Sequence, residues 1–144
     1  MIERVAARVL VLDEAGAVLL LRGIDPGRPH REPFWLTPGG GLEAGESLTD
    51  GARRELFEET GLRAERLELV GFVREADFEF EGAQYRQTET FFWVRAPRFD
   101  PVATNWSEIE HRFLLGHRWW TPTEIEATSD TIYPENLAAL IAKL

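Results

Sequence analysis

Three glutamates that could bind a metal stand close together in one short stretch of the chain, Glu55, Glu58 and Glu59. If the stretch is helical, their i, i+3 and i+4 spacing places the side chains on one face. Carboxylates this close repel one another, and no lysine follows at i+4 to relieve them. A hard divalent cation such as Mg²⁺ prefers oxygen ligands and turns this repulsion into attraction. The spacing indicates a metal site, and a solvated acidic helix face is the alternative interpretation.

The residues beside the cluster suit the same purpose. Arg54 precedes the first glutamate, where it can orient a carboxylate or contact a substrate phosphate. The glycines Gly39, Gly40 and Gly41 let a backbone loop approach closely, so that a loop carbonyl can join the metal shell.

The full pattern resembles the Nudix box, in which a glycine, a glutamate and an Arg-Glu-apolar-x-Glu-Glu-x-Gly-apolar run recur at fixed spacing. Every fixed position of the box is filled here, by Gly40, Glu46, Arg54, Glu55, Leu56, Glu58, Glu59, Gly61 and Leu62. A chance match at one start point is rarer than about one in a million with average residue usage. Outside the box, the order of elements and the Trp119-Trp120-Thr121-Pro122 segment are also similar to the family, less specifically.

The resemblance implies roles for the matched residues. Glu55, Glu58 and Glu59 would bind Mg²⁺ or Mn²⁺, with the carbonyl of Gly39 or Gly40 as a further ligand. Glu58, Glu59 and Arg54 would be catalytic, with Arg54 positioning a ligand carboxylate. Glu46 would brace the junction between loop and helix.

Members of the family often add a carboxylate from a later loop, as a ligand or as the general base. Glu108 and Glu110 both lie just before a predicted strand. Glu110 is preferred as a catalytic and metal-binding residue, because Ile109-Glu110-His111-Arg112 looks like a subfamily pattern. A solvated loop glutamate is the equally weighted alternative for either residue.

Basic and aromatic residues supply candidates for substrate binding. The metal would bridge phosphate oxygens and activate a water, a glutamate would accept its proton, and basic groups would neutralise developing charge. Arg22 is the preferred basic residue, because it ends a strand expected beside the site; the other candidates are Arg28, His30 and Arg31. Most aromatic residues are expected in the core, whereas Tyr133, before Pro134, is a candidate to stack on a base.

The substrate is predicted by exclusion. By resemblance, ADP-ribose enzymes tend to carry a proline downstream of the box, and none lies between Leu62 and Arg95 here. Dinucleoside polyphosphate enzymes tend to carry a tyrosine there, and Tyr85 lies too far along the chain to match it. The coenzyme A pattern is also not evident. We therefore expect hydrolysis of a phosphoanhydride bond in a nucleoside triphosphate or modified nucleotide. The alternatives are a nucleotide-sensing domain without catalysis, a hydrolase of dinucleoside polyphosphates or nucleotide sugars, an isomerase and an RNA-decapping enzyme.

Composition narrows the class of protein. The 144 residues suit one domain, residues 1–144, with 44% hydrophobic and 28% charged residues, as in soluble globular proteins. A net charge of −9 disfavours a long nucleic-acid partner. The absence of cysteine excludes disulfides, thiolate catalysis and Cys-ligated zinc. With no apolar run of membrane-spanning length and no signal peptide, we expect a cytoplasmic protein with no membrane partner; a homodimer is left open.

The elements that must position these residues follow from local patterns. Strands are expected over residues 5–12, 17–21, 34–36, 67–74, 78–80, 84–95 and 112–120. A helix is expected over 47–60, with Ser47 as N-cap, Asp50 completing a capping box and Gly61 ending it. Further helices are expected from 121 and over 134–144. The predicted fold is an α/β (α+β) sandwich around a mixed sheet, of the Nudix type by resemblance, with the Glu58 and Glu59 face pointing away from the core.

Overall fold

A long N-terminal hairpin organises the sheet. The computed structural model describes residues 1–28 and 30–144, and strand β1 (Ile2–Leu12) turns back into β2 (Val18–Gly23). Oδ1 of Asp13 accepts from the backbone N–H groups of Ala15 and Ala17, both at 2.9 Å, which closes the predicted turn. Gly16 adopts φ +84° in this turn, where a glycine is the least strained residue.

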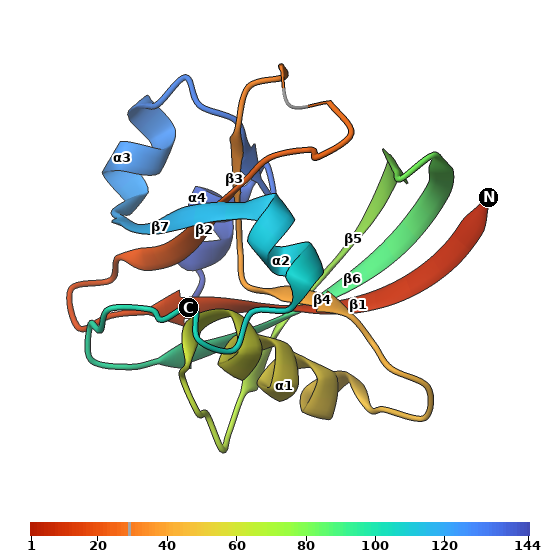
Figure 1. Ribbon diagram of the computed structural model, residues 1–144. Coiled ribbons are helices and arrows are strands. Elements are labelled where there is room, and N and C mark those ends of the chain that lie inside the picture. The colour runs from red at the N-terminus through yellow and green to blue at the C-terminus, as the bar shows by residue number, and fades with distance from the viewer. Residues whose placement is uncertain (29) are drawn as a thin grey trace.

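The sheet is mixed and strongly curled (Figure 1). Its strand order is β5-β6-β1-β2-β3-β8, with β4 paired to β1 and β7 paired to β2. The remaining strands are β3 (Phe34–Leu36), β4 (Gly39–Gly41), β5 (Glu68–Phe80), β6 (Ala83–Arg95), β7 (Leu114–Trp120) and β8 (Ile132–Tyr133). β1 runs parallel to β6 and antiparallel to β4, so it carries the loop of glycines on one edge and the long hairpin on the other.

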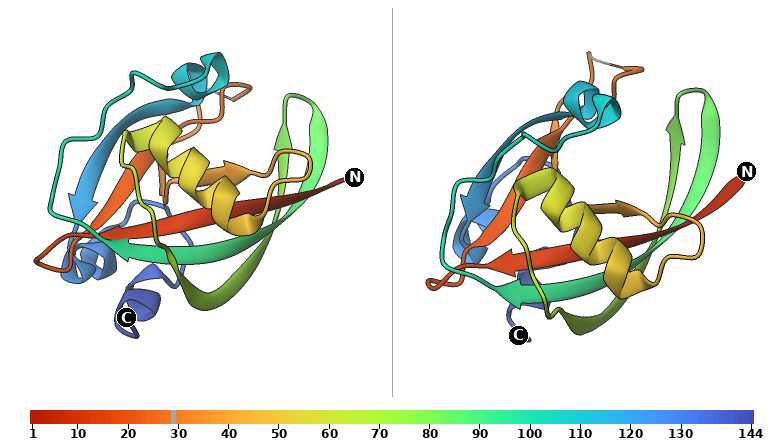
Figure 2. Two further views of the ribbon diagram at one scale, coloured as in Figure 1. Left: turned by 90° about the horizontal axis from the view of Figure 1, so that it is seen from below. Right: turned by 60° about the horizontal axis from the view of Figure 1, so that its bottom comes forward.

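Helices cover both faces of the sheet, which confirms the predicted α/β sandwich (Figure 2). Helix α1 (Leu48–Thr60) packs Ala52 and Leu56 against one face. Helix α4 (Leu137–Ile141) packs Leu137 and Leu140 against the other face, close to α3 (Pro122–Ala127). Alternation along β1 serves both layers, because its successive side chains point to opposite faces.

The box helix begins and ends where the sequence predicts. Oγ of Ser47 accepts from the Asp50 backbone N–H at 3.1 Å, and Gly61 ends α1 at φ +83°. The predicted capping box between Ser47 and Asp50 is only half formed, because the Asp50 carboxylate does not accept a hydrogen bond from the backbone N–H of Ser47.

Several predicted boundaries are wrong, and the first two strands begin or end a few residues from their predicted limits. Residues 67–74 and 78–80 form one continuous strand, because their alternation carries through residues 75–77 in β5. Arg112 and Phe113 belong to helix α2 (Glu108–Phe113), not to the following strand, since Ser107 and Glu110 form a full capping box. The C-terminal helix is confined to α4, shorter than the predicted 134–144. Among residues 1–28 and 30–144, no helix combines the length and apolarity needed to cross a membrane.

Candidate active site

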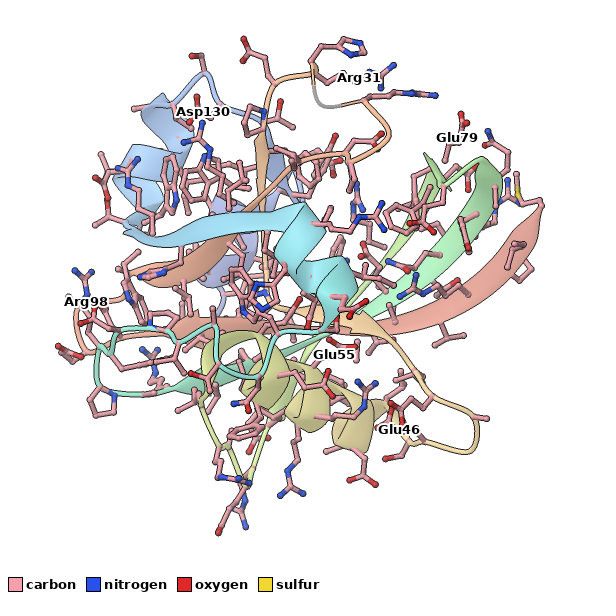
Figure 3. The ribbon with its side chains drawn as sticks, viewed as in Figure 1. Arg31, Glu46, Glu55, Glu79, Arg98 and Asp130 are labelled. Atoms are coloured by element: carbon pink, nitrogen blue, oxygen red, sulfur yellow. The ribbon has the colours of Figure 1, made fainter. Side chains whose placement is uncertain are left out.

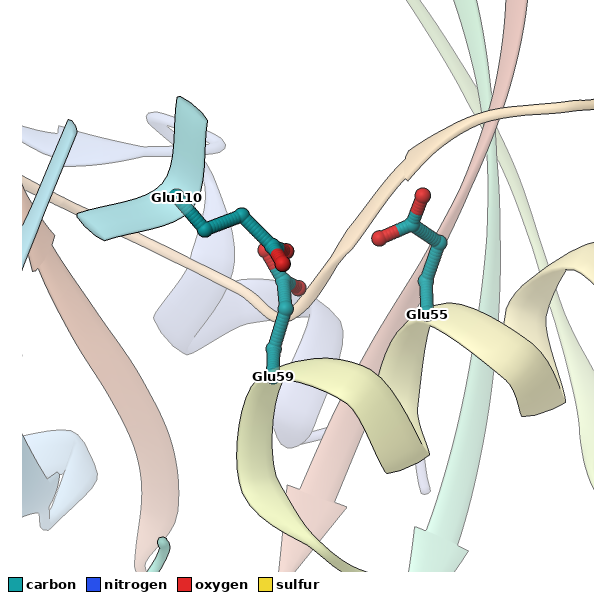
Figure 4. Close-up of side chains that lie close together, drawn as sticks. All are labelled: Glu55, Glu59 and Glu110. Carbon is teal, nitrogen blue, oxygen red and sulfur yellow. The ribbon is translucent and has the colours of Figure 1, made fainter. Parts of the chain in front are cut away.

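Three carboxylates from two helices meet beside strand β4. Glu55 and Glu59 come from α1 and Glu110 comes from α2, and one oxygen atom of each lies within 4.8 Å of the others (Figure 4). Trp106 fixes the α2 side of this arrangement, because its Nε1–H donates to the carbonyl of Glu59 at 2.9 Å. The structure thus brings Glu110, distant in sequence, to the helix that the spacing singled out.

Glu59 is buried, contrary to the expectation that its face points away from the core. Only 5% of the residue is exposed. Its Oε1 accepts from the backbone N–H of Gly39 at 2.6 Å, so the carboxylate lies against the glycine loop. Burial, reinforced by the nearby charge of Glu55, raises the pKa of Glu59 well above its usual value. An ionised carboxylate in this position requires a cation.

Glu55 lies against the same loop, one helical turn earlier. A β-carbon on Gly40 would come within 2.9 Å of its carboxyl carbon, so a larger residue at position 40 would displace this carboxylate. Burial raises the pKa of Glu55, while Arg54 opposes that shift and Glu58 adds to it. Figure 3 shows Glu55 on the side of α1 toward β4 and α2, and Glu46 beside the loop that leads into the helix.

Arg54 joins the loop, the helix and one of the three carboxylates. It donates twice to Glu46, at 2.8 and 2.9 Å, and once to the carbonyl of Gly41 at 3.1 Å. It also donates to Oε1 of Glu55 at 3.1 Å. The paired hydrogen bonds from Arg54 lower the pKa of Glu46 to about 2. Arg54 and Glu46 therefore join the loop to the helix.

Glu58 lies apart from the three converging carboxylates. Its side chain is 34% exposed, and Arg54 holds it at 3.2 Å. The i, i+3, i+4 spacing suggests three equivalent side chains, but the loop covers Glu59 and Glu55 and leaves Glu58 at the rim. Glu58 is therefore not among the residues that converge in this structure.

Glu110 and Glu108 both belong to helix α2 but lie in different surroundings. Glu110 is half-buried and faces α1, with its Oε1 accepting from the backbone N–H of Ser107 at 2.9 Å. Glu108 is exposed at the start of the helix and lies outside the converging group. The predicted preference for Glu110 agrees with this placement.

A buried ion-pair network behind the glycine loop was missed in the sequence. Glu89 on β6 is 4% exposed and accepts from Arg8 and from Arg74, both at 2.8 Å. Arg8 also donates to the carbonyl of Gly39 at 3.2 Å, so the network reaches the predicted carbonyl ligand. The signal that could have identified it is the acidic Glu89 between Thr88 and Thr90, directly before the apolar run Phe91-Phe92-Trp93.

The two predicted substrate-binding residues lie on different faces. Tyr133 packs edge-on against Phe34 at 5.7 Å between centroids, and the Arg74 guanidinium lies over its ring at 5.0 Å. Arg22 instead lies over the ring of Trp35, its strand neighbour, at 5.4 Å. Since Trp35 and Phe34 point to opposite faces of β3, Arg22 faces away from Tyr133.

The other basic candidates lie in the loop before the box. Arg28 pairs with Glu79 at 2.7 Å, at the tip of the β5–β6 hairpin. His30 and Arg31 are exposed in this loop. None of the three enters the group formed by Glu55, Glu59 and Glu110.

The donor set fits a hard divalent cation. Three carboxylates converge with a backbone carbonyl nearby, and oxygen ligands of this kind suit Mg²⁺ or Mn²⁺. A hollow of about 380 Å³ on the outer side of α1 is lined by Arg53, Arg54 and Arg63 and by none of the three carboxylates.

Comparison with known proteins gives the family. The family model described as NUDIX domain matches residues 2–141. The chain belongs to the Nudix family. An uncharacterized Nudix hydrolase of Shigella flexneri is 30% identical over 135 residues, 94% of this chain and 68% of that protein.

Two further similar proteins carry names of activities. A mouse protein named oxidized purine nucleoside triphosphate hydrolase is 39% identical over 82 residues, 56% of this chain and 47% of that protein. The matched region spans about half the length of this and another curated relative. The E. coli dihydroneopterin triphosphate pyrophosphohydrolase structure has a TM-score of 0.68 at 23% identity, covering 100% of this chain and 97% of that one. This likeness shows that the fold is shared.

Proposed function

We propose that this Nudix protein hydrolyses a phosphoanhydride bond in a nucleoside diphosphate linked to a further group, with a nucleoside triphosphate or modified nucleotide as the favoured substrate. The convergence of Glu55, Glu59 and Glu110 carries the proposal. Buried like charges are costly, and a divalent cation offsets that cost. Family membership and the complete box support the same activity.

Each residue has a defined task in this reaction. When bound, Mg²⁺ or Mn²⁺ supplies charge neutralisation at the phosphate oxygens and lowers the pKa of a coordinated water. Glu55 and Glu59 would hold the ion, with the Gly39 carbonyl and Glu58 as further ligands. Glu110 accepts a proton from the attacking water, which bonds to phosphorus as the anhydride P–O bond breaks and a phosphate leaves. Arg54 keeps the Glu55 carboxylate in place through its contact at 3.1 Å.

An aromatic pair near the site supports a nucleotide as substrate. Phe34 and Tyr133 are in contact, and Tyr133 is 36% exposed, so its ring is available for stacking on a base. The name of the mouse relative, which refers to oxidized purine nucleoside triphosphates, favours a purine nucleotide. Dinucleoside polyphosphates and nucleotide sugars share the diphosphate that such a site would recognise.

A substrate panel tests the proposal. Purified protein is assayed with nucleoside triphosphates, 8-oxo-purine triphosphates, dinucleoside polyphosphates and nucleotide sugars, with Mg²⁺, with Mn²⁺ and with EDTA. We expect metal-dependent release of phosphate or pyrophosphate, fastest from a triphosphate, and its loss in Glu59→Gln. Nucleotide binding without turnover in any arm would support the nucleotide-sensing alternative and contradict the proposed hydrolysis.

A further inference from the structure

Arg4 on β1 lies beside the candidate active site, on the same face of the strand as Arg8. The parallel register of β1 and β6 pairs Arg4 with Gln87, two positions before the network residue Glu89. Its guanidinium packs against Gly41, because a β-carbon there would come within 2.7 Å of Cζ of Arg4. Glycine at position 41 therefore makes room for a cation next to the loop that covers Glu55.

Arg4 differs from the neighbouring arginines in forming no direct ion pair within the described part of the chain. Arg8 and Arg74 share Glu89, and Arg54 is held by Glu46 and its neighbours. Across residues 1–28 and 30–144, no carboxylate lies within 4.0 Å of the Arg4 guanidinium. Crowding by protein atoms, and then repulsion from Arg8, lower the pKa of Arg4, although Glu55, Tyr85 and Glu89 oppose the shift. The guanidinium beside Gly41 therefore has N–H donors that no described carboxylate accepts at ion-pair distance, and that an anionic substrate can use.

A chain of pairwise contacts joins Tyr133 of the aromatic pair to the loop of glycines beside Arg4. Tyr133 contacts Arg74, Arg74 contacts Glu89, and Glu89 contacts Arg8. Arg8 donates to the carbonyl of Gly39, and the backbone N–H of Gly39 donates to Glu59. Arg4 lies beside Gly41, at the other end of β4, and is close enough to Glu55 to interact with its charge. A nucleotide with its base on Tyr133 and its reacting phosphates at the carboxylates would extend its last phosphate toward Arg4.

We propose that Arg4 binds the terminal phosphoryl group of a nucleoside triphosphate, which makes it a specificity-determining residue for triphosphates over diphosphates. The inference rests on the proposed function, since it assumes that a nucleotide occupies the site. A guanidinium offers several N–H donors in a planar fork that matches phosphate oxygens, and such charge-assisted hydrogen bonds are strong.

Binding measurements test the inference without turnover. Calorimetry with Mg²⁺ compares the α,β-methylene analogues of GTP and GDP on the wild type, Arg4→Gln and Arg4→Lys. Arg4→Gln should weaken the triphosphate analogue by roughly 10-fold or more and the diphosphate analogue by less than about 3-fold. Arg4→Lys should give an intermediate affinity, because it keeps the charge without the fork. Arg86→Gln is the control, since Arg86 lies on the opposite face of the neighbouring strand and pairs with Asp77.

The outcomes separate this inference from the proposed function. Equal loss for both analogues, no loss, or no binding of the triphosphate analogue by the wild type would each overturn the role of Arg4. If binding depends on Arg4 but no nucleotide in the panel is hydrolysed, the phosphate site stands and the proposed hydrolysis fails. Thermal denaturation of each variant, expected to match the wild type within a few degrees, checks the fold.

Discussion

The backbone N–H of Gly39 donates to Oε1 of Glu59 at 2.6 Å, although the two residues are 20 positions apart. This bond joins the glycine loop to the last turn of α1 and places a carboxylate where only 5% of the residue remains exposed. The same glycine offers its carbonyl to Arg8 at 3.2 Å. Gly39 thus connects the converging carboxylates with the ion-pair network on β6.

Replacing Glu59 by Gln should raise stability without metal and abolish activity. The pKa of Glu59 is raised, so its ionisation destabilises the fold as the pH rises from the usual carboxyl range through the raised pKa. At pH 8 in EDTA we expect Glu59→Gln to be more stable than the wild type by about 1 kcal/mol or more, measured by urea denaturation. Added Mg²⁺ should stabilise the wild type more than the variant. A variant less stable than the wild type in EDTA would contradict the assigned burial of charge.

Glu110 and Glu108 form a matched pair for testing the general base. Glu110→Gln should lower kcat by roughly 10²- to 10⁴-fold, the usual contribution of a general base. The glutamine can still accept the Ser107 N–H, so helix α2 keeps its cap. Glu108→Gln should leave kcat within about 2-fold, because Glu108 is exposed and outside the group. Steady-state kinetics would refute the assignment if the two variants behaved alike.

Glu89→Gln should destabilise the fold by about 3–5 kcal/mol, since removal of one partner leaves buried charges uncompensated. Glu89 is the shared acceptor of Arg8 and Arg74, both at 2.8 Å. The exposed Glu75 on the adjacent strand provides the control, and Glu75→Gln should change stability by less than about 0.5 kcal/mol. If Glu89→Gln and the wild type unfolded at the same denaturant concentration, the network around Glu89 would contribute no stability.

Glu46 should make an acid-sensitive contribution to stability. Arg54 lowers its pKa to about 2, so the stabilisation is complete above the ordinary carboxyl value of 4.5 and is lost as the pH falls toward 2. Glu46→Gln should therefore be less stable than the wild type at pH 7, on the order of 1 kcal/mol for a partly exposed pair. The difference in free energy of unfolding between the wild type and Glu46→Gln should become smaller as the pH falls from about 4.5 to 2. A gap independent of pH would indicate that the contact is not ionic.

The parts of the fold that depend on residues close together in the sequence could be predicted from the sequence. Helix α1 is one such part, because Ser47 and Gly61 mark its ends locally. The pairing of Arg8 with Glu89 spans 81 positions and depends on the parallel register of β1 and β6, which local patterns do not specify. Glu59 was expected to point outward, because spacing on a helix cannot reveal the loop that covers it.

Two site residues depended on tertiary arrangement for different reasons. The local pattern around Glu110 is enough to choose this residue. It does not predict helix α2, because the apolar residues of β7 follow directly and extend the predicted strand back to residue 112. The sequence gives no local sign that Arg4 belongs to the site, because Gly41 lies next to it only when β4 pairs with β1. Arg22 was chosen for its place at the end of a strand, which does not determine the face that its side chain occupies.

The most direct test of the metal site is anomalous scattering from crystals soaked with Mn²⁺ and the α,β-methylene analogue of GTP. We expect a Mn²⁺ peak at roughly 2.0–2.3 Å from carboxylate oxygens of both Glu55 and Glu59, with the phosphates of the analogue on the open side of the ion. A well-ordered analogue with no peak there, or a peak at another acidic group such as Asp77, would contradict the assignment of the metal site to these carboxylates.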